Sequence, residues 1–242
     1  MMMQMPRKII RIILIVICIP VFIAACGPSL PSSGSTYVNV LQVKTKAVTL
    51  ADLQAAFAGS SLTPPLYEQS PGTTLYGIVI PFDVPRLPEG VNFTSVHILL
   101  SPVKSDNSWN KDVNRVTMIP GNENRTSDVT EATNIAADIS ATISILSGKV
   151  GVGQEKSETY QKIYRSVAIH ADPEGQIRWD FTPFLDEPIH PGLYYVVAVY
   201  EIPNDTTGNK FIASSSCAYE VSSVMGDKSS CGPGAHSTIV IP

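Results

Sequence analysis

The sequence lacks the short motifs that identify the common enzyme classes. It has no Gly-x-Ser-x-Gly pattern, so the serine nucleophile of that arrangement is not indicated. Its four histidines, His97, His170, His190 and His236, stand singly and show no His-Glu-x-x-His spacing of the kind that binds zinc. The sequence therefore predicts no catalytic residue, no metal site and no cofactor.

Positive charge is also scarce, and long apolar runs are missing. The chain has 17 Lys and Arg residues against 21 Asp and Glu residues, a net charge of −4. A nucleic-acid partner is excluded on this ground, because binding to phosphates needs a basic surface. The most apolar run, Ile12 to Ile23, is too short for a membrane-spanning helix, which needs about 20 apolar residues.

What the chain does have is an export signal at its N-terminus. Arg7, Lys8 and Arg11 precede the apolar run, and small residues follow it. A basic segment, an apolar segment of roughly 7 to 15 residues and small residues at a cleavage point are the parts of a secretory signal peptide, in the required order. We therefore expect residues 1–25 to be removed from the mature protein.

The end of this signal resembles the lipobox of bacterial lipoproteins, and the resemblance covers residues 1–26 only. It rests on Ile23, Ala24, Ala25 and Cys26, an aliphatic residue and two small ones before a cysteine. In that class the cysteine receives a diacylglycerol, so the resemblance implies lipidation of Cys26 and a membrane anchor. Gly27 in place of Asp implies the outer membrane in a Gram-negative cell; in a single-membrane cell the anchor lies on the outer face of the plasma membrane.

Loss of the signal changes the charge and the cysteine count. Three of the 17 basic residues and none of the 21 acidic ones leave with residues 1–25, so the net charge falls from −4 to −7. Cys18 is discarded and Cys26 carries lipid, which leaves Cys217 and Cys231. In an oxidising compartment such a pair is expected to form a disulfide.

The mature chain divides into a tether and one domain. Residues 26–36 have the composition of a flexible tether. Residues 37–242 are predicted to form a single extracytoplasmic domain, an antiparallel β-sandwich of Greek-key or immunoglobulin-like type with one or two short helices. One helix is expected to follow Thr49, which can act as an N-cap with Asp52 three residues later, and to end at Gly59.

Strands are indicated by residues that alternate between apolar and polar. Such alternation marks 37–43 and 76–84, and further strands are expected at 96–100, 113–119, 193–202, 211–221 and 237–241. The segment 193–202 is apolar on both faces, which is typical of a central strand. Pro81 cannot donate a ladder hydrogen bond, so its strand is expected to lie at an edge or to be interrupted there.

The turn at residues 171–176 predicts a hairpin and its register. Asp172 and Pro173 fit a type I turn, and Gly175 fits the position that needs a positive φ. If Asp172 pairs with Gln176, residues 169 and 167 lie opposite residues 179 and 181 on one face, whereas His170 and Arg178 lie on the other.

One segment, residues 129–154, does not fit the strand pattern. It is rich in Ala, Ser, Thr, Ile and Gly and can be interpreted as a helix capped by Thr130 or as a hairpin that turns at Ser147-Gly148-Lys149. A hairpin with one polar and one apolar face would suit a membrane-inserting strand pair, and it would equally suit a packed hairpin at one end of the sandwich.

Three functions remain after these exclusions. The leading hypothesis is a lipid-anchored protein of the cell envelope, of binding or structural type and not an enzyme, with a protein or glycan partner. The alternatives are a membrane-active protein that uses residues 129–154 and a hydrolase whose site is assembled from distant loops. A pocket in which His170 or His190 is hydrogen-bonded to a carboxylate would favour the hydrolase.

Overall fold

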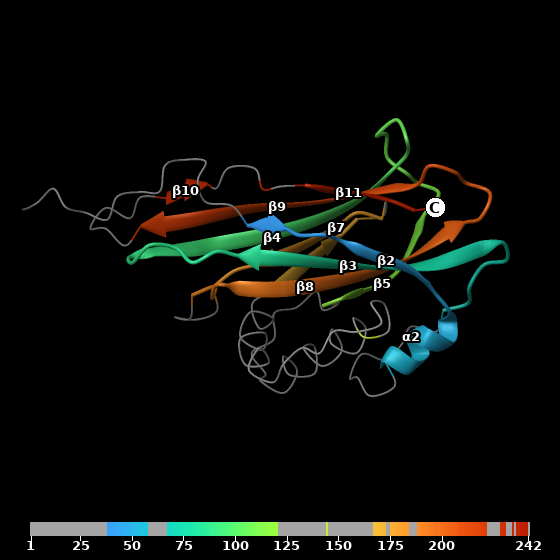
Figure 1. The fold of residues 1–242 in the computed structure, drawn as a ribbon, viewed down its shortest axis with the longest axis horizontal. Helices are drawn as coiled ribbons and strands as arrows, with labels where there is room; N and C mark the ends of the chain where they lie inside the picture. Colours follow the sequence, from blue (N-terminus) through green and yellow to red (C-terminus); the bar gives the residue numbers. More distant parts are fainter. Residues whose placement is uncertain are drawn as a thin grey trace, which may run out of the picture.

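The protein is a sandwich of two antiparallel β-sheets with one short helix beside it (Figure 1). The computed structural model describes residues 38–57, 67–120, 167–172, 175–183, 188–221, 228–230 and 236–241, and the single positions 144 and 234. The predicted mainly β sandwich is confirmed. The signal, the tether and nearly all of the segment 129–154 lie outside the described residues, so the predictions for them stay predictions.

Each sheet combines strands that are distant in the sequence. Sheet A has the order β1-β3-β8-β5, with β2 also paired to β3, and consists of β1 (Asn39–Val40), β2 (Lys44–Val48), β3 (Thr73–Val84), β8 (Gly192–Pro203) and β5 (Asn114–Ile119). Sheet B has the order β10-β9-β4-β7-β6, with β11 also paired to β9, and consists of β10 (Lys228–Ser230), β9 (Lys210–Val221), β4 (Val91–Val103), β7 (Ile177–Phe181), β6 (Val167–Ala171) and β11 (Ser237–Val240). All of these pairings are antiparallel.

The core lies between the sheets and is rich in aromatic rings. Phe82 of sheet A packs against Phe181 of sheet B with ring centroids 5.3 Å apart. Tyr200 of sheet A packs against Phe211 of sheet B at 4.7 Å. Trp179 is fully buried, and its indole nitrogen donates to the carbonyl of Pro120 at 3.2 Å. Burial of each such large side chain stabilises the fold by roughly 1.5–3 kcal/mol.

The predicted hairpin is confirmed in its register and in the positive φ of Gly175, whereas residues 173 and 174, the centre of the predicted type I turn, lie outside the described residues. The amide of Asp172 donates to the carbonyl of Gln176 at 3.2 Å, and Gly175 has φ of 86°. Residue 169 lies opposite Trp179, and residue 167 lies opposite residue 181. Sheet A also holds the hairpin turn in place, because the Tyr200 hydroxyl donates to the carbonyl of Gly175 at 2.6 Å. The hairpin is therefore held at both its turn and its core face.

The strand that contains Pro81 is central and continuous, so the prediction that it lies at an edge or is interrupted at Pro81 is wrong. β3 pairs with β8 on one side and with β1 and β2 on the other. The carbonyl of Pro81 accepts from the amide of Leu41 at 2.8 Å, in the gap between β1 and β2. The backbone N and C=O of a strand residue point to the same side of the strand. The missing N–H donor of Pro81 therefore falls where the neighbouring strand changes from β1 to β2. The interruption therefore lies between β1 and β2, on the neighbouring side of the sheet, and not in β3.

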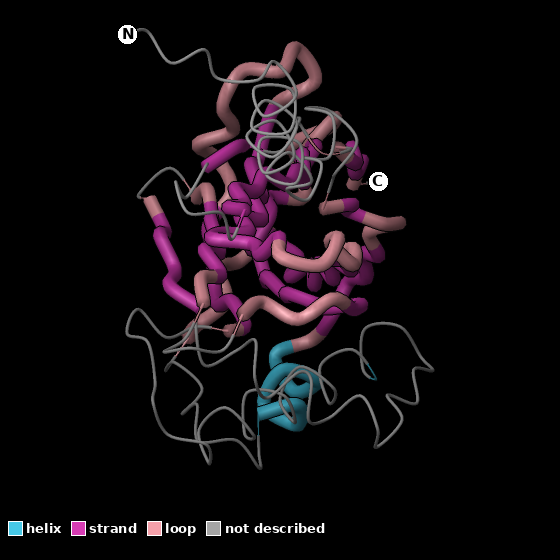
Figure 2. Tube along the Cα trace, turned by 90° about the vertical axis from the view of Figure 1, so that its left-hand side faces the viewer, coloured by secondary structure: helices cyan, strands magenta, loops and turns pink. Residues whose placement is uncertain are grey.

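The helix α2 (Leu50–Phe57) begins at the predicted cap. The amide of Asp52 donates to Thr49 Oγ1 at 3.1 Å, and the Asp52 carboxylate accepts from the Thr49 amide at 2.9 Å. These bonds form a capping box, and they lower the pKa of Asp52. Figure 2 shows α2 below the strands. Gly59, the predicted helix end, lies outside the described residues. No helix among the described residues is long and apolar enough to cross a membrane.

One carboxylate is buried at the end of sheet A. Glu201 is 3% exposed. It accepts hydrogen bonds from the Tyr67 hydroxyl, from the Ser70 amide at 2.6 Å and from Thr73 Oγ1 at 2.6 Å. Burial alone would raise the pKa of Glu201, but the hydrogen bonds outweigh it and lower the pKa to about 2. Burial, together with the bond to Glu201, raises the pKa of Tyr67. This carboxylate is a structural group that is satisfied on all sides.

Candidate binding face

The outer face of sheet B carries polar side chains, whereas its inner face packs against the core. Along β4, β7 and β6 the apolar residues point into the core, so their neighbours in the sequence point outward. The registers place His97 opposite Asp180, Leu99 opposite Arg178, and Arg178 opposite His170. Strand alternation therefore gathers these side chains on one surface, which is opposite to the core.

Asp180 joins three of these side chains. His97 Nδ1 lies 2.5 Å from Asp180 Oδ1, and His170 Nε2 lies 3.0 Å from Asp180 Oδ2. Arg178 donates to the same Oδ2 through Nη2 at 2.9 Å and through Nε at 3.1 Å. We refer to His97, His170, Arg178 and Asp180 as the Asp180 cluster.

The carboxylate of Asp180 and the guanidinium of Arg178 form an ion pair within the Asp180 cluster. Asp180 is 8% exposed, which a carboxylate tolerates only when it is paired or hydrogen-bonded. The positive charge of Arg178 compensates its negative charge, and the two histidines supply the remaining hydrogen bonds. Because the carboxylate is held from three sides, its orientation is fixed before any ligand arrives.

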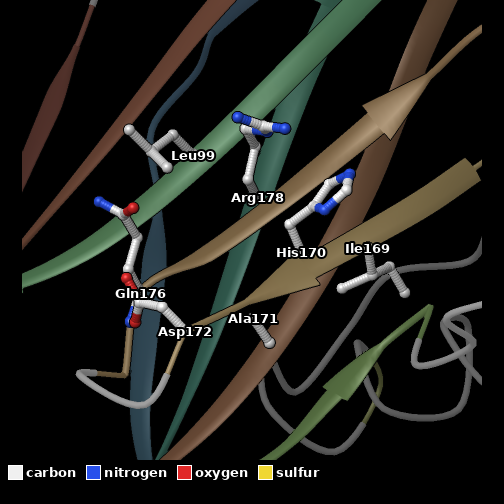
Figure 3. A pocket seen from close by; sticks show the side chains of 7 residues that line it. All are labelled: Leu99, Ile169, His170, Ala171, Asp172, Gln176 and Arg178. Atoms are coloured by element: carbon white, nitrogen blue, oxygen red, sulfur yellow. The ribbon is translucent and has the colours of Figure 1, made fainter.

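Two hollows adjoin the Asp180 cluster. The larger, about 570 Å³, is the hairpin hollow, lined by Leu99, Ile169, His170, Ala171, Asp172, Gln176 and Arg178. Figure 3 shows Leu99, Arg178 and His170 on three neighbouring strands, with Gln176 and Asp172 at the turn. The smaller, about 260 Å³, is the serine hollow, lined by His97, Leu99, Arg178, Ser214, Ser215 and Ser216. Leu99 and Arg178 line both, so the two hollows are neighbours on one surface.

The structure brings together two of the four histidines that stand singly in the sequence. His97 and His170 meet at Asp180, which sequence reasoning had not assigned to a site. The predicted hairpin placed His170 and Arg178 on the outer face, and Asp180 lies on that same face by alternation. Nothing in the sequence places His97, 83 residues before Asp180, beside them.

The other two histidines lie away from this surface. His190 lines a separate hollow of about 240 Å³ between residues 85–93 and 188–191, and its main-chain carbonyl accepts from the Tyr194 hydroxyl at 2.9 Å. Its buried Nε2 has no hydrogen-bond partner among the described residues. His236 is exposed just before β11. Neither lines the hairpin hollow or the serine hollow.

Hydrogen bonds and an ion pair hold the Asp180 cluster together. Within the described part of the chain, no group of three or more His, Cys, Asp or Glu side chains could hold a metal ion. Arg178 and His170 share one oxygen of Asp180. The positively charged guanidinium of Arg178 thus already binds the carboxylate oxygen that a metal ion would need as a ligand.

The predicted lipid and disulfide sites are only partly described. Cys217 is 5% exposed on β9 and points into the core. Cys26 and Cys231 lie outside the described residues, so lipidation and the disulfide stay predictions. Ser230 of β10 lies opposite Ala218 of β9, so the antiparallel register leads to Cys217 as the next position on β9.

Comparison with known proteins adds little to this description. No family model matches the sequence, and no curated protein matches it. One solved structure that the fold resembles, described as a pore forming protein, shares 5% sequence identity, with 84% of this chain and 93% of that chain covered. The TM-score is 0.32, which is too low to carry an argument about function.

Proposed function

We propose that the protein is a lipid-anchored binding protein of the cell envelope that holds a hydroxyl-rich ligand, a glycan, on the outer face of sheet B. The observation that carries this proposal is the hairpin hollow beside the Asp180 cluster. Its volume, about 570 Å³, lies within the usual range of ligand sites, roughly 300–1,000 Å³. A protein segment as the ligand is the alternative occupant of the same surface.

The lining of the hairpin hollow supports a neutral polar ligand. An arginine side chain has five N–H donors, and two nitrogens of Arg178 bind Asp180, which leaves donors for a ligand. When neutral His170 donates through Nε2 to Asp180, its Nδ1 becomes an acceptor. Gln176 donates to Ser101 at 2.9 Å and keeps its carbonyl oxygen. Leu99 adds an apolar contact. Donors, acceptors and an apolar patch match the hydroxyl groups and ring faces of a sugar.

The compartment in this proposal comes from the N-terminus. The lipobox-like residues 23–26 support an acylated Cys26, and the tether 26–36 supports a domain that stands off the membrane. The described β10–β9 register supports a bond from Cys217 to Cys231. Substitution Cys26→Ser in the producing cell is expected to move the protein from the detergent phase to the aqueous phase on phase separation. An unchanged detergent fraction would contradict the lipid anchor.

The ligand site is tested by filling the hollow without replacing any residue of the Asp180 cluster. Leu99→Trp places a larger side chain between the two hollows, and strands accept Trp readily. The matched control is Ile212→Trp, on the outer face of β9 but outside both hollows. The native lipidated protein is cross-linked in its envelope, purified and analysed for attached glycan and protein.

We expect wild type and Ile212→Trp to retain the same attached glycan and Leu99→Trp to lose it at least tenfold. An attached protein with the same dependence on Leu99 would identify a protein segment as the occupant and replace the glycan. Equal recovery from all three proteins, or recovery of lipid-processing machinery alone, would contradict a binding site at the hairpin hollow.

A further inference from the structure

A serine, a histidine and an aspartate lie in one row across sheet B. Ser216 of β9 is directly opposite His97 of β4, and His97 is directly opposite Asp180 of β7. All three point to the outer face, because Ser216 and His97 have buried neighbours on both sides in their own strands. Directly opposed residues have Cβ atoms about 4.5–5.5 Å apart, so each side chain can reach the next.

The hydrogen bond of Asp180 sets the role of His97. The carboxylate only accepts, so neutral His97 donates through Nδ1, which lies 2.5 Å from Asp180 Oδ1. The opposite ring nitrogen, Nε2, then carries a lone pair and is a base. The row has the order of a nucleophile, a base and a group that orients the base.

Two further side chains hold Asp180 in the position from which it orients His97. Arg178 and His170 bind its other oxygen at 2.9 Å and 3.0 Å, which fixes the carboxylate and leaves Oδ1 for His97. A base that is oriented by a fixed, largely buried carboxylate keeps one tautomer. Arg178 and His170 are positioning residues in this arrangement, because they act through Asp180.

The serine hollow gives a substrate access to the row. It is lined by both His97 and Ser216, and Arg178 lines it as well. Ser216 is exposed and lines this hollow, so its hydroxyl can turn toward His97. Arg178 supplies a fixed positive charge at the hollow in which negative charge would develop on a carbonyl oxygen.

We propose that Ser216, His97 and Asp180 form a catalytic row that hydrolyses carboxylic esters, an activity that goes beyond ligand binding. The Ser216 oxygen attacks the ester carbonyl carbon, and its proton passes to His97 Nε2. The bond from the carbonyl carbon to the alcohol oxygen breaks, and the alcohol leaves with that proton. Water then attacks the acyl group on Ser216, gives its proton to His97, and the carboxylic acid leaves as Ser216 recovers its proton.

The test uses the full-length lipidated protein in detergent and two probes. An alkyl fluorophosphonate reacts with an activated serine, because the serine oxygen bonds to phosphorus and fluoride leaves; mass analysis of the digested protein locates the label. Hydrolysis of p-nitrophenyl acetate is followed by release of p-nitrophenol. The variants are Ser216→Ala, His97→Gln and, as a matched control, Ser95→Ala. Ser95 is a partly exposed serine of β4 that lines neither hollow.

We expect the label on Ser216 in wild type and in Ser95→Ala, and none at this position in Ser216→Ala. Ester hydrolysis should fall about 100-fold or more in Ser216→Ala and His97→Gln, as expected for loss of a nucleophile or a general base, and stay within twofold of wild type in Ser95→Ala. Absence of label in wild type, label on another residue, or equal hydrolysis by wild type and Ser216→Ala would overturn the proposal.

Discussion

The buried carboxylate of Glu201 should make the stability of the protein depend on pH in the acid range. In the folded protein its pKa is about 2, whereas its ordinary value is 4.5. Each unit of difference corresponds to about 1.4 kcal/mol, so the ionised form of Glu201 contributes about 3 kcal/mol to folding near neutral pH. A large effect is expected because Thr73, Ser70 and Tyr67 all donate to this group.

The sign of the effect follows from the direction of the shift. A group whose pKa is lower in the folded state stabilises the fold fully above its unfolded value, near pH 4.5, and loses this contribution as the pH falls toward 2. In Glu201→Gln the group no longer titrates. The difference in free energy of unfolding between wild type and Glu201→Gln should therefore be largest at pH 7 and shrink steadily between pH 4.5 and pH 2.

The assay is urea unfolding of the full-length chain at several pH values from 7 to 2, followed by tryptophan fluorescence. Glu68→Gln is the matched control, because Glu68 is exposed and lies next to Tyr67 in the sequence. We expect its unfolding free energy to follow that of wild type at each pH. If the difference between wild type and Glu201→Gln does not change with pH, the carboxylate is not held as the structure shows, and the reasoning is refuted.

Three further predictions concern the core, the helix cap and the cysteines. Trp179→Ala should lower the free energy of unfolding by about 3–5 kcal/mol, because Trp179 is fully buried. Trp109→Ala should lower it by less than about 1 kcal/mol, because Trp109 is 42% exposed. Equal losses in urea unfolding would contradict the core assignment. Thr49→Ala should cost about 1 kcal/mol through loss of the N-cap, measured in the same way, and an unchanged value would show that the cap contributes nothing. Alkylation without reductant should leave Cys217 and Cys231 unlabelled, and reduction should cost roughly 3 kcal/mol for a loop of about 15 residues; labelling of both thiols before reduction would rule out the bond.

The parts of the fold that depend on neighbouring residues could be predicted from the sequence. The hairpin turn was predicted because Asp172 and Gly175 have local conformational preferences, and the register followed from where the turn places each side chain. The cap at Thr49 is local in the same sense. The environment of Pro81 was not predicted, because the edge or central position of a strand depends on which distant strands join it.

The Asp180 cluster shows the same division. Alternation along β7 puts Arg178 and Asp180 on one face, and the hairpin register adds His170. His97 and Ser216 join them only because the sheet order is β9-β4-β7-β6. That order depends on how the two sheets pack their aromatic side chains together, which no spacing in the sequence records.

The sequence by itself determined the β-sandwich class and the ends of several elements, because alternation, turns and caps act over a few residues. It also supplied the expected export signal and Cys26 as the expected anchor. Only the tertiary structure decided which polar side chains meet. Asp180 is one acid among 21 in the sequence, and it becomes the centre of a site because strands far apart in the chain place two histidines and an arginine around it.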